Sequence, residues 1–373
     1  MCTKDKKIIL VILAACLMGS NIPANDSLAA DDVVSIVNME DDSSNQTNDA
    51  EGDLKSVGDD ETDIARGGVN DNTEINKSKE TSNVSVKSKK KYGSRKLVGK
   101  TVRWKLPDGE YDTVQYALSE AANDKKHKYY IKVPKGTYIS NKTWNINGKN
   151  IILDMRGATF KRPKNVKVAT IFFRIGRNGK GKYKGAQNIK LIGGTLDNGN
   201  GSRSADLMAI VHSKNVTIKG MTFKFLPKKK LGAKGRNGHM IETSAVTRVL
   251  IKKCKFYNNR NCQRNNEAVQ FESNVNSKEM IRHWESAGYR DGTTTSHVTV
   301  TRCYFKGFRY GCGSNHLAKK DTFKHMVFTK NKFVGAKKFA ICMFRFKYVK
   351  IKGNRLVRCG RLYQNQFSSH ISD

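Results

Sequence analysis

His297-Val298-Thr299-Val300, followed by Phe305, is one copy of a phrase that recurs along the chain and decides the fold. In each copy apolar and polar residues alternate, and a further apolar residue stands five positions after the second apolar one. Apolar residues at every second position predict a short β-strand with one buried face. The other copies begin at Asn188, Asn215, Arg248, His325 and Tyr348.

The spacing of the copies predicts how these strands are arranged. The residue two before the last apolar position recurs at intervals of 27, 33, 49, 28 and 23 residues between Gly194 and Asn354. Such a period is typical of a β-solenoid, whose coils stack because no single coil can bury its own apolar face. The alternative is an antiparallel sandwich, but the unit lacks the Asn-Gly hairpin signals of paired strands. We therefore expect an all-β fold, a right-handed single-stranded parallel β-helix.

The N-terminus predicts the compartment. Lysines precede the apolar run Ile8–Met18, and the small residues at 27–30 offer a peptidase site, so residues 1–30 are expected to be a secretory signal peptide. The run is too short to span a bilayer, and no transmembrane segment is expected. Leu13-Ala14-Ala15-Cys16 also matches a lipoprotein box, which leaves a lipid anchor at Cys16 as the alternative to plain secretion. In both cases we expect the mature chain outside the cytoplasm or at the cell surface.

Composition divides the rest of the chain into two parts. Residues 31–97 are rich in Asp, Ser and Asn, end in a basic run and show no periodicity, which predicts a disordered acidic linker. Residues 98–373 are expected to form the β-helix domain. In residues 100–373, 56 Lys and Arg stand against 16 Asp and Glu, a net charge of +40 that would attract polyanions. The alternative is that these lysines only keep the solenoid soluble.

The cysteines do not indicate a metal site. Cys254 and Cys303 occupy the same repeat position on adjacent coils, which suits either a disulfide or, as we prefer, a pair of buried thiols. No Cys-x-x-Cys or Cys/His spacing for a metal is present, and we expect neither metal nor cofactor. We expect a monomer.

The first coils resemble those of a known superfamily. Residues 112–122 predict a short amphipathic helix that caps the open end of the solenoid. The phrases V-P-K-G-T-Y at 133–138, N-I-I-L-D at 150–154 and G-G-T-L-D-N-G at 193–199 follow it. This order resembles the pectate-lyase-like and polygalacturonase-like right-handed β-helix proteins, including secreted proteins of Gram-positive bacteria. The resemblance covers about residues 100–360 and implies a pectin-lyase-like solenoid.

The resemblance also implies where a site would lie. Polygalacturonase-like enzymes carry carboxylates on neighbouring coils, followed by Gly-His-Gly and Arg-x-Lys. The same order of residue types occurs here at 238–242, 267–272, 313–316 and 345–347. The motifs themselves differ, because glutamates replace aspartates and neither an Asp-Asp pair nor Gly-His-Gly is present.

The residues themselves predict a polar cluster. If the strand at 240–244 lies against the strand at 268–272, Glu242, Gln270 and Glu272 point outward on adjacent coils, with Glu272 diagonal to Glu242. Two such carboxyl groups can act as general acid and as base or nucleophile on a glycosidic bond. The expected catalytic residues are Glu242, Glu267, Glu272, His239 and His316. The alternative is that the acids only offset a basic surface.

Basic residues around this cluster are expected to hold an anionic chain. The expected substrate-binding residues are Gln270, Arg345, Lys347, Lys228, Lys229, Lys230 and Arg236. The sequence thus predicts a secreted β-helix protein that acts on an acidic polysaccharide or an anionic cell-wall polymer, as a glycoside hydrolase. The alternatives are a polysaccharide lyase and a non-catalytic surface adhesin. Nucleic acid is not expected as a partner, because the chain is exported and contains no recognised nucleic-acid-binding module.

Overall fold

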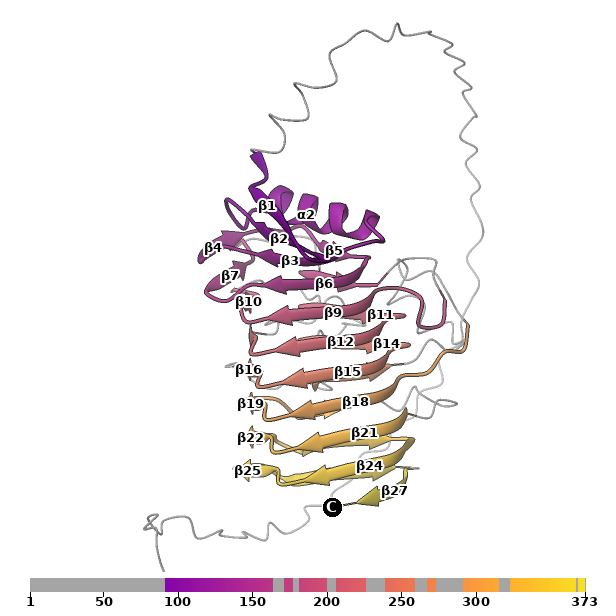
Figure 1. The fold of residues 1–373 in the computed structure, drawn as a ribbon. Coiled ribbons are helices and arrows are strands. Elements are labelled where there is room, and N and C mark those ends of the chain that lie inside the picture. The colour runs from indigo at the N-terminus through magenta and orange to yellow at the C-terminus, as the bar shows by residue number, and fades with distance from the viewer. Residues whose placement is uncertain are drawn as a thin grey trace, which may run out of the picture. The chain divides into compact units, whose positions relative to one another are not determined.

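The computed structural model describes residues 91–163, 171–176, 181–199, 206–225, 239–258, 267–272, 291–314, 323–366 and 368–372. Within these ranges nearly all regular structure is β-strand, arranged in three sheets whose strands stack in coil after coil (Figure 1). The predicted signal peptide, Cys16 and most of the predicted linker lie outside the described residues. The first strand begins at Ser94, a few residues before the domain boundary expected at 98.

The largest sheet, here called sheet A, has 11 strands. It consists of β1 (Ser94–Val98), β2 (Thr101–Lys105), β3 (Lys128–Lys132), β6 (Lys149–Asp154), β9 (Gln187–Ile192), β12 (Lys214–Lys219), β15 (Thr247–Lys252), β18 (Ser296–Thr301), β21 (Phe323–Thr329), β24 (Phe346–Lys352) and β27 (Ser369–Ser372). Only β1 is antiparallel to its neighbour. These strands contain every copy of the repeated phrase.

The other two sheets have eight strands each. Sheet B consists of β4 (Gly136–Ile139), β7 (Ala158–Lys161), β10 (Thr195–Asp197), β13 (Thr222–Lys224), β16 (Lys255–Tyr257), β19 (Tyr304–Lys306), β22 (Lys332–Val334) and β25 (Arg355–Val357). Sheet C consists of β5 (Trp144–Ile146), β8 (Phe173–Ile175), β11 (Met208–Val211), β14 (Ile241–Ser244), β17 (Glu267–Glu272), β20 (Tyr310–Gly313), β23 (Phe339–Phe344) and β26 (Arg361–Gln366). Each coil visits A, B and C in turn, so strands of the same sheet pair in parallel.

The core follows from the repeated phrase. The last apolar residue of each phrase lies on sheet B, where successive copies are direct register partners. The rings of Phe223, Phe256, Phe305 and Phe333 stack face to face, with centroids 4.7–4.9 Å apart. This distance matches the spacing of hydrogen-bonded strands, so one aromatic ring per coil fills the interior without a gap. The predicted parallel stacking of the coils is confirmed.

The turn from sheet A to sheet B has the same two-residue length in six coils, from β9–β10 to β24–β25. The second residue of this turn points inward and forms a hydrogen-bonded ladder. The buried Asn331 side chain accepts from the Cys303 backbone N–H at 2.9 Å and donates to the Val300 carbonyl, also at 2.9 Å. On the preceding coil the Cys303 Sγ accepts from the Cys254 N–H at 3.4 Å. Both cysteines are free and buried, as the thiol interpretation predicted.

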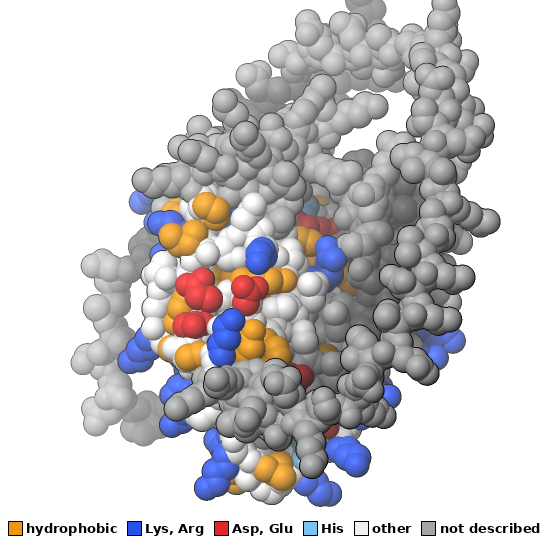
Figure 2. All heavy atoms as spheres, turned by 90° about the horizontal axis from the view of Figure 1, so that it is seen from above, with side chains coloured by type: hydrophobic (Ala, Val, Ile, Leu, Met, Phe, Trp, Pro, Cys, Tyr) orange, Lys and Arg blue, Asp and Glu red, His pale blue; other side chains and the backbone are white. Residues whose placement is uncertain are grey.

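Helix α2 (Tyr111–Asn123) lies beside the first strands at the N-terminal end of the coils (Figure 1). Its buried side chains include Val114, Ala117, Leu118 and Ala121, which join the same apolar core as the strands. In the view onto this end, acidic side chains gather on the exposed face, with Lys and Arg both beside them and around the margin (Figure 2). None of the described helices is long and apolar enough to cross a membrane.

Candidate functional site

Parallel register brings the predicted site residues of two coils together on sheet C. Glu242 of β14 is the direct partner of Gln270 of β17, and Ser244 is the partner of Glu272. This is the alignment expected from the sequence, and it places Glu272 diagonal to Glu242. The row that contains Glu242 runs across all eight strands of sheet C and comprises Asn145, Arg174, Ala209, Glu242, Gln270, Gly313, Cys342 and Gln364.

A bend at the start of the sheet C strands places further residues, His239 and Glu267, on the same outer face as Glu242 and Gln270. Two successive residues, Ala268 and Val269, both enter the apolar core, so the alternation of faces is interrupted there. Glu267 before this pair and Gln270 after it therefore lie on the same outer side of the sheet. Met240 and Ile241 repeat the bend one coil earlier, which places His239 beside Glu242 in the same way.

Asp206 belongs to this cluster, although the sequence analysis did not select it. Its Oδ1 accepts the backbone N–H of His239 at 2.7 Å, and burial together with the negative charge of Asp206 raises the pKa of the neighbouring Glu242. Two carboxyl groups placed close together favour a proton on one of them. The signal that would have found Asp206 is the coil alignment itself, because extending the β11–β14 register by two residues sets Asp206 opposite His239.

The carboxyl groups are buried, although they lie on the outer side of sheet C. Glu242, Glu267 and Glu272 are 8%, 3% and 2% exposed. Side chains of the adjacent coils, about 4.8 Å away, flank them, such as Gln270 beside Glu242 and Ser244 beside Glu272. Burial also raises the pKa of Glu267, to about 8. The pKa of Glu242 lies well above its usual value because of burial and the neighbouring charges of Asp206, Glu272 and Glu267.

Two further contacts order the cluster. The His239 Nδ1 lies 3.2 Å from the carbonyl oxygen of Glu267 and 3.5 Å from its Oε2, so a proton on Nδ1 can be shared with either. The Gln270 amide Nε2 donates to Glu272 Oε1. The Gln270 Oε1 is buried and makes no hydrogen bond with the described residues. The arrangement thus combines protonated carboxyl groups with an amide that holds a neighbouring carboxylate in place.

Three arginines near the cluster supply positive charge. Arg174 lies in the same row as Glu242, separated from it by Ala209, and its buried Nε makes no hydrogen bond with the described residues. Burial lowers the pKa of Arg174. Burial likewise lowers the pKa of Arg162, to about 10, against the opposing charge of Asp206. Arg309 interacts electrostatically with Glu267 and lowers its pKa. Arg174 lies in β8.

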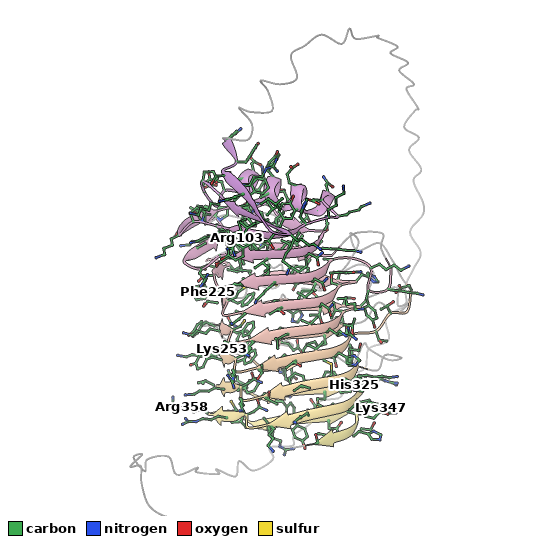
Figure 3. All side chains as sticks on the ribbon, viewed as in Figure 1. Arg103, Phe225, Lys253, His325, Lys347 and Arg358 are labelled. Carbon is green, nitrogen blue, oxygen red and sulfur yellow. The ribbon has the colours of Figure 1, made fainter. Side chains whose placement is uncertain are left out.

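The remaining predicted residues are not on sheet C or are not described. Arg345 lies in the turn between β23 and β24 with a positive φ of 60°, and its guanidinium lies 6.0 Å from the Phe344 ring. Lys347 is part of sheet A, where it pairs with Lys324. Figure 3 shows Lys347 at the end of a sheet A strand near His325. His316, Lys228, Lys229, Lys230 and Arg236 lie outside the described residues.

The cluster does not form a metal site among the described residues. No group of three or more His, Cys, Asp or Glu side chains there has the arrangement to hold a metal ion. The carboxyl, imidazole and guanidinium groups of the cluster can transfer protons and stabilise charge.

Comparison with known proteins places the fold. No protein-family model matches the chain, and no curated protein is similar to it in sequence. Among solved structures, two of the surface adhesin PfbA of Streptococcus pneumoniae are similar, with TM-scores of 0.54 and 0.52 and sequence identities of 20% and 21%. The fold is a pectin-lyase-like parallel β-helix. The β-helix matches cover 70% and 67% of this chain but 66% and 64% of the PfbA chains, just under two thirds of their length.

A pectate lyase from Bacillus sp. N165, solved with trigalacturonate, is also similar to the β-helix. Its TM-score is 0.43 at 13% identity, and the match covers 70% of this chain and 83% of the lyase. At these identities the comparisons show the fold and leave the chemistry to the residues of the cluster.

Proposed function

We propose that this chain is a secreted or cell-surface β-helix protein that acts on an acidic polysaccharide as a glycoside hydrolase. The observation that carries the proposal is the placement of Asp206, Glu242 and Glu272 on three adjacent coils, where burial and the neighbouring acids raise the pKa of Glu242. Paired carboxyl groups of which one keeps its proton are what glycoside hydrolysis requires. The domain has few acids and many cations, so four acids within one small cluster are not explained by average surface composition.

The roles follow from the environment of each group. Glu242 is the proposed general acid, because burial and neighbouring negative charge keep it protonated near neutral pH. Glu272, held by Gln270, is the proposed base or nucleophile. Arg174 is the proposed partner for a carboxylate of the substrate, since its buried guanidinium lies in the same row. His239 and Glu267 are proposed to orient the cluster through their mutual contact.

A second candidate, a non-catalytic glycan-binding adhesin, is favoured by a different observation. The two PfbA structures, titled as a surface adhesin, have TM-scores above one half, whereas that of the pectate lyase lies below it. The carboxyl groups are almost fully buried, and this burial is compatible with a polar cluster that only stabilises the fold. A lyase remains the third alternative and would use a base rather than an acid at the scissile bond.

The test is to incubate the purified protein and its Glu272→Gln variant with a panel of acidic polysaccharides. A hydrolase releases new reducing ends without ultraviolet absorbance from an unsaturated uronate, and Glu272→Gln abolishes this while the far-ultraviolet circular dichroism stays unchanged. The matched control is Glu120→Gln, which replaces a partly exposed acid of α2 that is not part of the cluster. Undiminished turnover by Glu272→Gln rules out its assignment, and glycan binding without products supports the adhesin.

A further inference from the structure

Sheet C is not the only face on which the coils align side chains. At the two-residue turn from sheet A to sheet B, the first residue has a positive φ in every one of the six coils. Glycine occupies this position at Gly193, Gly220 and Gly353, toward the two ends of the series. In the three consecutive coils between them the residues are Lys253, Arg302 and Lys330, with φ values of 55°, 54° and 55°.

The fold does not require these three side chains. A left-handed backbone conformation is unfavourable for any residue with a Cβ, and Lys and Arg lack the short side-chain hydrogen bonds that make Asn tolerant of it. Lys253, Arg302 and Lys330 are exposed, and none makes a side-chain hydrogen bond or ion pair with the described residues. The chain thus places a cation at three successive turns where the neighbouring coils have glycine at the same position.

The neighbouring strands extend this cationic turn row into a wider surface. The flanking exposed or half-buried basic residues on sheets A and B are Lys252, Lys255, Lys306, Lys332, Lys352 and Arg355. The segments 247–258, 296–309, 323–338 and 346–358, which form these coils, contain no Asp or Glu. Figure 3 shows Lys253 on the side of the coils opposite Lys347.

Two tyrosines interrupt the cations on the outer face of sheet B. Tyr304 is the register partner of Lys255 on one side and of Lys332 on the other. Its ring contacts that of Tyr257, with centroids 5.5 Å apart and planes tilted by 49°. Both rings are half-buried, so each presents part of its surface to solvent between lysines. An aromatic ring beside cations offers contact to the C–H face of a sugar as well as to its charge.

From these features we infer that the cationic turn row and the Tyr257–Tyr304 pair form a second binding surface, for an extended acidic polysaccharide. The coils place one cation about every 4.8 Å along the solenoid axis, which is comparable to the length of one pyranose residue in an extended chain. A uronate at each sugar therefore meets one cation per coil. Duplex DNA fits less well, because its phosphates rise by about 3.4 Å along a strand and fall out of register with the coils.

This inference concerns a surface separate from sheet C and does not depend on catalysis there. It agrees with the proposed function in substrate class, since a chain held at the cationic turn row keeps an acidic polysaccharide at the protein between turnovers. If sheet C proves inert, the cationic turn row still predicts binding. The two proposals therefore fail separately.

The test replaces Lys253, Arg302 and Lys330 together by Gly in the full chain and measures binding of polygalacturonate by calorimetry at low salt. Because glycine relieves the backbone conformation, the thermal midpoint is expected to stay equal or to rise, while affinity falls at least about tenfold. Should the glycines loosen the turns, Lys253→Gln, Arg302→Gln and Lys330→Gln test the same charges. The control removes three exposed lysines at the opposite ends of sheet A strands, as Lys128→Gln, Lys149→Gln and Lys324→Gln.

Three results support the inference together: loss of binding in the glycine variant, near-normal binding in the control, and no binding of fully methyl-esterified polygalacturonate by the native chain. If the glycine variant and the control variant lose the same affinity for polygalacturonate, net charge alone explains the binding and the proposal is overturned. Tighter binding of duplex DNA than of polygalacturonate would overturn it as well. The Glu120→Gln variant, measured in parallel, should retain this binding in full.

Discussion

At the scale of single residues, the chain places acids where they are hardest to ionise. Glu267 is almost fully buried, and its neighbours include His239 and Arg309. Burial outweighs the favourable charge of Arg309, which is why the pKa of Glu267 rises to about 8. A carboxyl group in this state is a proton donor at neutral pH and contributes its stabilisation to the fold only while protonated.

The stability of the protein should therefore depend on pH through Glu267. Its pKa rises from 4.5, the ordinary value, to about 8 in the folded state, so the folded protein binds this proton more tightly. The stabilisation is complete below about pH 4.5 and is lost as the pH rises through about 8. We expect urea unfolding midpoints to fall between about pH 5 and 8, and Glu267→Gln to flatten that fall. An unchanged slope in the variant would show that other groups cause it.

Residue patterns explain why part of the cluster was predictable. Glu242, Gln270 and Glu272 were aligned correctly because each follows the alternating pattern of its strand. Asp206 was missed because the following residues 207–211 are all apolar and show no alternation. The burial of the acids was also not predictable, since the bend formed by two successive inward residues is invisible to a simple period of two.

At the scale of structural elements, the turn from sheet A to sheet B controls the stacking of the coils. Its inward residue replaces missing backbone partners, as Asn331 does for Cys303 and Val300. The sequence analysis used this very position to measure the repeat, and the constant turn length explains why that measurement succeeded. The insertions that made the intervals unequal fall elsewhere in the coil.

Asn331→Ala should destabilise the fold strongly. The substitution leaves the buried Cys303 N–H without its partner and removes the hydrogen bonds to the Val300 carbonyl and to Asn354. A buried donor without a partner costs about 1–3 kcal/mol. The control is Asn365→Ala, which removes an exposed side chain that accepts only the Ser368 N–H at 3.2 Å. Chemical unfolding followed by circular dichroism measures both. Equal stability losses in the two variants would show that the inward ladder has no special role.

At the scale of the whole molecule, charge is the dominant property. The chain carries a formal net charge of +36, and the strands and turns of sheets A and B from β15 onward contain cations but no Asp or Glu. The three-sheet architecture could be predicted from the repeat because stacking is the only way to bury the apolar face. The partner could be predicted only as a class, since net charge specifies a polyanion but no sugar or linkage.

Binding of an acidic polysaccharide should consequently weaken steeply with salt. Exposed charges are screened over about 8–10 Å at physiological ionic strength, so affinity is expected to fall about tenfold or more between about 0.05 and 0.15 M salt. Titration of polygalacturonate at several salt concentrations measures the slope. Affinity that stays constant with salt, or that is equal for a neutral glycan, would contradict an electrostatic mode of recognition.

The connections between strands differ in how much their length varies. They have a constant length between sheets A and B and a variable length beside sheet C. Six connections there are two residues long, whereas those that lead into and out of sheet C range up to more than twenty residues, as between β17 and β18. New segments can therefore enter beside sheet C without shifting the register of a single coil. Loops of different length and sequence can therefore be exchanged beside sheet C to change what the protein recognises. The two-residue turns between sheets A and B keep the coils in register.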